Sequence, residues 1–104
     1  MALTKDFMIA VRIYEYNVLD EPVWFARLVK EFEDAGTMDH VTVVKYTRKL
    51  FVLGIIYDKW VNIDGKWVRT FRIDENALSM IRSIAEKYPS SLGQPKKGER
   101  PQEA

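Results

Sequence analysis

One stretch of the chain constrains the fold more than any other: residues 42–74, TVVKYTRKLFVLGIIYDKWVNIDGKWVRTFRID. Its first part has apolar residues at helical spacing up to Gly54, whereas its second part is rich in β-branched and aromatic residues. Asp64-Gly65 divides the second part, and an Asp-Gly pair between two such runs is a strong signal for a tight β-hairpin. The sequence therefore predicts a helix followed directly by a two-stranded ribbon.

The remainder of the domain is predicted to be helical. Apolar spacing predicts helices at approximately residues 4–16, 22–35, 39–53 and 74–88. Asp20 and Pro22 favour the start of the second helix, and Asp39 or Thr37 can cap the third. A chain of 104 residues suits one domain with one modest core. We expect an α+β domain, mainly helical, in the order three helices, hairpin, helix.

The composition changes after residue 88. Residues 89–104, PSSLGQPKKGERPQEA, are rich in Pro, Gly, Ser and charged residues and have little apolar surface to bury. We therefore assign residues 4–88 to the domain and predict a disordered polar tail at residues 89–104.

The amino-terminal residues and the absence of cysteine bear on the compartment. The first residues carry Lys5, Asp6, Arg12 and Glu15, so they lack the uninterrupted apolar core of a signal peptide. No window of the sequence is long and apolar enough to span a membrane. With no cysteine there is no disulfide framework to favour an oxidising compartment. These features predict a cytoplasmic protein without a membrane segment.

The residues most used in catalysis and metal binding are scarce. The chain has no cysteine and one histidine, His40, which leaves no partners for a His/Cys metal site or a histidine-activated nucleophile. The acidic group Glu31, Glu33, Asp34 and Asp39 is interpreted as a solvated helix end, and no Gly-rich phosphate loop occurs. We predict no enzyme activity, no cofactor and no metal, although composition leaves open acid–base chemistry by carboxylates alone.

The formal net charge of +1 conceals a segregation of charge along the chain. Residues 1–44 hold four basic and eight acidic residues, a net charge of −4. Residues 45–72 hold seven basic and two acidic residues, a net charge of +5, and residues 73–104 hold five of each sign. The positive charge thus lies on the predicted third helix and hairpin, which is typical of a polyanion-binding face. The alternative is a chance distribution of solvated surface charge.

The predicted third helix has two different faces. Its buried stripe is drawn through Val43, Tyr46 or Thr47, Leu50 and Leu53. The opposite face, at spacings of four, three and four residues, carries Val41, Lys45, Arg48 and Val52. Two basic side chains are therefore expected to point away from the core.

The predicted ribbon also has two faces. A two-residue loop pairs Asn62 with Trp67 and Trp60 with Arg69, and this face, with the large apolar groups, is expected to pack inward. The other face is expected to be cationic and carries Tyr57, Lys59, Lys66, Thr70 and Arg72. Trp24, Trp60 and Trp67 are interpreted as packing residues rather than as a ligand cage or a base-stacking site, with Trp67 the most exposed.

Three helices followed directly by a β-hairpin resemble the winged-helix proteins, a branch of the helix-turn-helix group that includes many small bacterial and archaeal transcriptional regulators. Thr42-Val43, Arg48-Lys49-Leu50 and Leu53-Gly54-Ile55-Ile56 are similar to the family's recognition-helix pattern and its passage into the wing. The resemblance covers approximately residues 5–88. It implies a DNA-binding transcriptional regulator with helix 39–53 in the major groove and hairpin 56–73 as the wing.

The resemblance implies contacts to double-stranded DNA by eight residues: Thr42, Lys45, Arg48, Lys49, Lys59, Lys66, Arg69 and Arg72. Arg48 is the best candidate for a bidentate contact to guanine, and Lys45 and Lys49 can contact bases or phosphates. The four wing residues would neutralise phosphates, which sets affinity and salt dependence rather than sequence preference. Thr42, near the amino end of the helix, would donate to a phosphate.

The resemblance also implies a twofold homodimer and a partner in the transcription machinery, which the protein would compete with or recruit at a promoter. The expected dimer surfaces are the first and last helices, whose surplus apolar residues are Met8, Ile9, Ile13, Met80 and Ile84.

The alternative function is a winged-helix protein-interaction or assembly module that does not bind DNA directly. It is favoured by the acidic first part of the chain and by apolar residues on the supposed DNA face, namely Val41, Val44, Phe51 and Val52.

Overall fold

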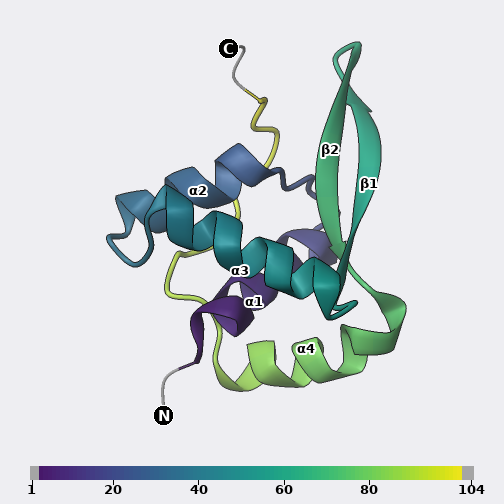
Figure 1. Ribbon diagram of the computed structural model, residues 1–104. Helices are drawn as coiled ribbons and strands as arrows, with labels where there is room; N and C mark the ends of the chain where they lie inside the picture. The colour runs from purple at the N-terminus through teal and green to yellow at the C-terminus, as the bar shows by residue number, and fades with distance from the viewer. Residues whose placement is uncertain (1–2, 102–104) are drawn as a thin grey trace.

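The computed structural model describes residues 3–101, which contain four helices and one two-stranded hairpin. The elements are α1 (Lys5–Val18), α2 (Phe25–Asp34), α3 (His40–Val52), β1 (Ile56–Ile63), β2 (Lys66–Ile73) and α4 (Glu75–Lys87). The helices form a body from which the hairpin projects (Figure 1). The structure confirms the predicted α+β class and element order.

Helix α1 lies at the centre of the body, in contact with α3, α4 and β2. Because α1 is covered on several sides, Ile9, Ala10 and Ile13 are all fully buried in the protein's own core. The interpretation of Ile9 and Ile13 as surplus residues for a dimer surface is therefore wrong. The helical spacing identified apolar residues correctly, but it did not show how many sides of this helix are covered.

Helix α2 begins later than the sequence predicts, at Phe25 rather than near Pro22. Asp20 adopts a left-handed conformation, with φ of 54°, and the chain then runs extended to Trp24. The Val23 carbonyl accepts a hydrogen bond from the Phe71 amide of β2 at 3.0 Å. These residues thus bind the edge of the hairpin, and this contact prevails over the local start signal.

Both ends of α3 are set by local hydrogen bonds. The Asp39 carboxylate caps its amino end by accepting from the Thr42 amide at 2.8 Å, as predicted. At the other end Gly54 has a φ of +72°, and the Ile55 amide donates to the Leu50 carbonyl at 3.0 Å. This bond across six residues defines a Schellman motif, which reverses the chain directly into β1.

The hairpin has the predicted register. Asn62 pairs with Trp67 and Trp60 with Arg69, so the loop consists of Asp64 and Gly65 alone. Both loop residues have positive φ, 52° and 86°, as the tight turn requires, and the Gly65 amide donates to the Asn62 side chain at 2.9 Å.

Residues 89–101 follow α4 without forming a helix or strand and lie along α1 and α2 (Figure 1). The Ser90 amide donates to Glu15 at 2.9 Å, and the Gly93 carbonyl accepts from Arg12 at 2.7 Å. Nearer the end, Arg100 pairs with Asp64 in the hairpin loop at 2.5 Å. Disorder of residues 89–104 stays a prediction, and the last three of them lie outside the described residues. A disordered tail would lose these three contacts.

Arg12 is the most enclosed charge of the body, with only 1% of its surface exposed. Its guanidinium donates two hydrogen bonds to Glu31 of α2, at 2.9 and 2.6 Å, and one to Glu15 at 2.9 Å. The Tyr16 hydroxyl donates to Glu31 at 2.8 Å, and burial together with this bond raises the pKa of Tyr16. Arg12 therefore joins α1, α2 and the carboxy-terminal segment through one side chain.

Replacing Arg12 with Met should lower the free energy of unfolding by about 3 kcal/mol, because it leaves two carboxylates without their cation in a largely enclosed site. Lys30→Met is the control, since it removes the same charge from an exposed pair with Asp34 on α2. The control should change stability by less than about 0.5 kcal/mol. Urea unfolding measures both variants, and equal losses would contradict this role for Arg12.

Candidate nucleic-acid interface

Helix α3 turns one face to the core and the other to solvent. Val43, Thr47 and Leu50 are buried, so Thr47 rather than Tyr46 completes the inward stripe. Leu53, predicted to be buried, is 56% exposed. Leu53 is the carboxy-terminal cap residue of α3, and Ile55 beyond it enters the core instead.

The outward face of α3 carries the residues that the helical spacing assigned to it. Lys45 and Arg48 are exposed, and Val41 and Val52 beside them are 72% and 86% exposed. The Lys45 ammonium lies 5.4 Å from the centroid of the half-buried Tyr46 ring. Among residues 3–101, Lys45 and Arg48 form no ion pair with an acidic side chain. Two cations are thus presented three residues apart on a surface that is otherwise apolar.

Lys49 and Thr42, two further predicted DNA contacts, already form interactions within the protein. The Lys49 ammonium pairs with the Asp6 carboxylate of α1 at 3.0 Å, and the Thr42 amide donates to Asp39. Burial would raise the pKa of Asp6, but hydrogen bonds from Thr4, Lys49 and the Phe7 amide hold it below its usual value. The Lys49–Asp6 pair therefore fixes α3 against α1.

Replacing Asp6 with Asn should cost about 1.5 kcal/mol of stability at pH 7, the size expected for hydrogen bonds to a charged group. Because the pKa of Asp6 is lowered by folding, its stabilisation is complete above the unfolded value of about 3.9 and is lost as the pH falls through the folded value. The difference between wild type and variant should therefore shrink below about pH 4. Urea unfolding at several pH values measures it.

Asp34→Asn provides the matched control for this pH dependence, because Asp34 is an exposed carboxylate whose ion pair links residues of one helix. Its effect should stay below about 0.5 kcal/mol throughout. An Asp6→Asn effect of the same size at pH 3 and pH 7 would contradict the role of the ionised carboxylate.

The face of the hairpin that was predicted to pack inward is mostly exposed. Trp60 and Trp67 are 58% and 68% exposed. Only the base of this face is covered, where Phe71 meets Phe51 of α3 edge to face with ring centroids 5.6 Å apart. The prediction for Trp60 is wrong because the hairpin extends beyond the body, so the four helices do not cover its outer half (Figure 1). Trp24, by contrast, is buried as predicted.

Arg69 connects the hairpin to α3. Its guanidinium pairs with Asp58 at 2.8 Å and lies 5.0 Å from the centroid of the Phe51 ring and 5.6 Å from that of Phe71. The cation therefore lies over these two phenyl rings. Arg69 is half-exposed at the junction of the two elements.

The other face of the hairpin carries the remaining predicted cations. Lys59 and Lys66 are exposed, whereas Arg72 is half-buried with Asp20 at 3.9 Å. Thr70, expected on the cationic surface, is buried, and its hydroxyl donates to the Lys59 carbonyl at 2.6 Å. Lys59 and Lys66 are thus separated from Lys45 and Arg48 by the thickness of the ribbon.

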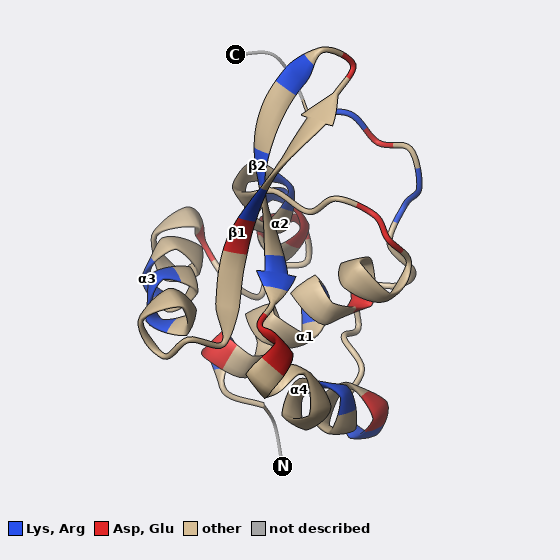
Figure 2. Ribbon diagram, turned by 90° about the vertical axis from the view of Figure 1, so that its right-hand side faces the viewer, with Lys and Arg blue, Asp and Glu red and all other residues tan. Residues whose placement is uncertain are grey.

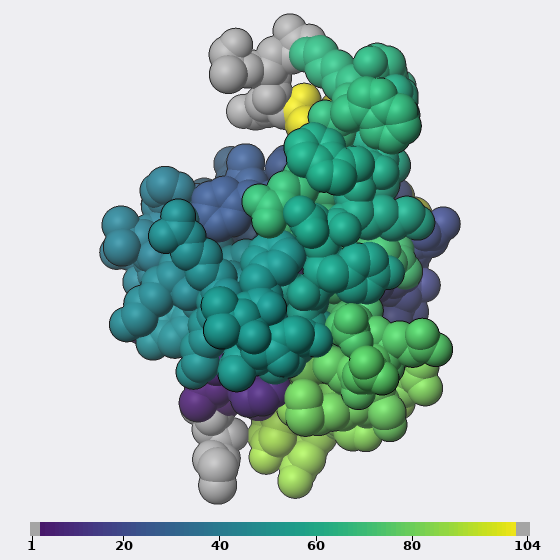
Figure 3. Space-filling model, turned by 45° about the vertical axis from the view of Figure 1, so that its right-hand side comes forward, coloured from purple at the N-terminus to yellow at the C-terminus, as the bar shows by residue number. Residues whose placement is uncertain are grey.

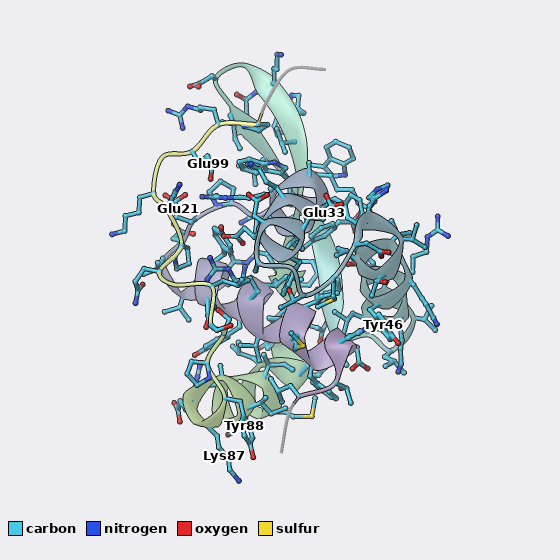
Figure 4. The ribbon with its side chains drawn as sticks, turned by 90° about the vertical axis from the view of Figure 1, so that its left-hand side faces the viewer. Glu21, Glu33, Tyr46, Lys87, Tyr88 and Glu99 are labelled. Atoms are coloured by element: carbon cyan, nitrogen blue, oxygen red, sulfur yellow. The ribbon has the colours of Figure 1, made fainter. Side chains whose placement is uncertain are left out.

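Basic residues follow α3 and the hairpin in Figure 2, and the two elements form a continuous surface in Figure 3. A second charged cluster lies elsewhere: Arg27 pairs with Glu21 at 3.6 Å and with Glu99 at 3.1 Å. Figure 4 shows these two glutamates against the carboxy-terminal segment, on the side of the molecule away from Tyr46. This cluster therefore lies apart from Tyr46 and α3, although Asp6 and Asp20 of the acidic first part of the chain pair with Lys49 and Arg72 of the basic part.

Two other classes of site find no support in the described part of the chain. Within residues 3–101, no group of three or more His, Cys, Asp or Glu side chains is placed to hold a metal ion. No helix in that range has the length and apolar character needed to cross a membrane.

Comparison with known proteins identifies the fold. No protein-family model matches the chain, and no curated protein matches its sequence. Among solved structures, the chain is similar to the crystal structure of a PadR family transcriptional regulator from Eggerthella lenta DSM 2243, with a TM-score of 0.51 and 22% identity. The match covers 77% of this chain and 70% of that chain. The chain thus has a winged-helix fold, in which β1 and β2 form the wing.

Proposed function

We propose that the protein is a DNA-binding transcriptional regulator that places α3 in the major groove and its wing along the adjacent backbone. The observation that carries this proposal is the outward face of α3, where Lys45 and Arg48 are exposed without an acidic partner in the described part of the chain. A helix of this kind fits the major groove, and the Arg48 guanidinium matches the two acceptors of a guanine edge. The similar PadR family structure, described as a transcriptional regulator, supports the assignment.

The other predicted contacts take secondary roles in this proposal. Lys59 and Lys66 are exposed on the wing and would neutralise phosphates, as would Arg69 at its base. Lys49 and Arg72 contribute positive charge while paired with Asp6 and Asp20, and Thr42 would approach a phosphate only through its hydroxyl. Sequence preference would therefore depend mainly on Lys45 and Arg48.

The regulatory role is proposed to operate in the cytoplasm by occupation of a promoter. The bound protein would compete with the transcription machinery for the site or recruit it. No catalytic step is part of this mechanism.

The regulator is proposed to bind as a homodimer, because twofold winged-helix proteins place two α3 helices on half-sites about one helical turn apart. With Ile9 and Ile13 in the core, the remaining apolar surface of α1 and α4 includes the exposed Val18 and Met80.

Met80→Glu should convert the dimer to a monomer in sedimentation experiments at micromolar concentration, because it places a charge in an apolar contact. Ser79→Glu is the matched control, since it adds the same charge at the neighbouring exposed position of α4. A wild-type protein that sediments as a monomer would contradict dimerisation.

The second candidate function is a protein-interaction module. It is favoured by the exposure of Val41 and Val52, which give the outward face of α3 an apolar character. On DNA, the same side chains would contact thymine methyl groups.

Fluorescence anisotropy with a random-sequence DNA duplex at several salt concentrations tests the proposed function. Lys45→Ala/Arg48→Ala should lower affinity about tenfold and make the slope of log K against log salt less steep by about 0.9 for each phosphate that is no longer neutralised. The matched control is Arg82→Ala/Lys87→Ala, which removes two exposed charges from α4. This control should change affinity by less than about twofold, because only long-range attraction is affected.

Absence of binding by the wild type at low salt would overturn the DNA-binding proposal and favour the protein-interaction module. Equal effects of the two double variants would show attraction to net charge without a specific role for α3.

A further inference from the structure

The wing carries two exposed tryptophans that lie outside the core formed by residues 3–101. Trp60 and Trp67 are absent from the core cluster and from the partly buried residues packed against it. Within residues 3–101, neither indole makes an aromatic ring pair or lies under a cation. Indole rings are the largest apolar groups among the side chains and normally contribute by being covered. Their exposure therefore leaves a large apolar surface available to another molecule.

These tryptophans are continuous with the proposed DNA-binding face of α3. Phe51 lies three residues after Arg48 and so neighbours it on the helix surface. Arg69 lies 5.0 Å from the Phe51 ring and pairs across the hairpin with Trp60. Trp67 lies diagonally opposite Trp60, two residues nearer the loop, within reach of a large side chain. We call Phe51, Arg69, Trp60 and Trp67 the aromatic band.

The chemistry of the aromatic band favours nucleobases as its occupant. Indole rings and guanidinium planes stack on the faces of all four bases, with little dependence on sequence. Arg48, which neighbours Phe51 of the band on α3, is exposed, and its positive charge attracts a polyanion. A base pair within an intact duplex hides its faces by stacking, so an indole reaches those faces only where the stack is open.

We propose that Trp60 and Trp67 form a stacking surface for unpaired bases, so that the protein prefers a duplex that is open beside the site contacted by α3. This inference rests on the proposed function and names the form of DNA that the wing selects. The bases that stack on the wing leave the duplex at a cost that is lowest at a preformed fork or bubble. Easily unstacked pyrimidine–purine steps would come next.

Two DNA probes of the same random sequence test this preference by anisotropy: a blunt duplex and the same duplex ending in a short single-stranded fork. The wild type should bind the fork about tenfold more tightly, the effect expected from stacking one base on an aromatic side chain. Trp60→Leu/Trp67→Leu should lose this preference and keep its affinity for the blunt duplex within about twofold. Trp60→Phe/Trp67→Phe, which retains aromatic rings, should keep part of it.

Tryptophan fluorescence gives a direct readout, because stacking on a base quenches indole emission. Trp24 is buried and remains in every variant, so it serves as an internal reference. The wild type should show quenching with the forked probe that Trp60→Leu/Trp67→Leu does not show. Circular dichroism and thermal unfolding establish that this variant is folded.

Three results would overturn the inference, and they differ in what they leave standing. Equal affinity of the wild type for both probes, without quenching, would remove the stacking role and leave DNA binding by α3 intact. Binding of neither probe would remove both proposals. An emission change that depends on protein concentration without DNA would assign the two tryptophans to a contact between copies of the chain.

Discussion

The position of the hairpin relative to α3 depends on one short connection. Only residues 53–55 separate α3 from β1, and the left-handed Gly54 with its Schellman hydrogen bonds reverses the chain within them. A longer or looser connection would let the hairpin pack elsewhere. The short one places its base on Phe51 and brings Arg69 over that ring. The outward face of α3 and the wing consequently meet at Phe51, Phe71 and Arg69.

The charges of the body divide into a structural set and a surface set. Arg12 and Arg27 are nearly enclosed and hold α1, α2 and the carboxy-terminal segment through their carboxylate and carbonyl partners. Lys49 locks α3 to α1 through Asp6. Lys45 and Arg48 form no such ion pair in the described chain, although they belong to the same sequence cluster as Lys49. A count of charge along the sequence cannot separate these sets, because only folding determines which cations meet a carboxylate.

Much of the fold was predictable because its signals are local. The Asp64-Gly65 turn, the Asp39 cap and the glycine after α3 each act within a few residues, and each is confirmed. The errors concern contacts between distant parts of the chain. The start of α2 depends on Phe71 of β2, and the burial of Ile9 depends on how many elements surround α1. Trp60 is exposed because the hairpin projects beyond the body. The alternation of side chains along a strand does not predict how far a hairpin projects.

Together, the two proposals make the outward face of α3 and the aromatic band of the wing one nucleic-acid interface. Amide and indole N–H resonances, followed by NMR while a forked duplex is added at low salt, test this interface residue by residue. We expect the largest shifts at Lys45, Arg48 and the Trp60 and Trp67 indoles, while α4 and the Trp24 indole change little. Shifts confined to α1 and α4, or no shifts at all, would contradict it.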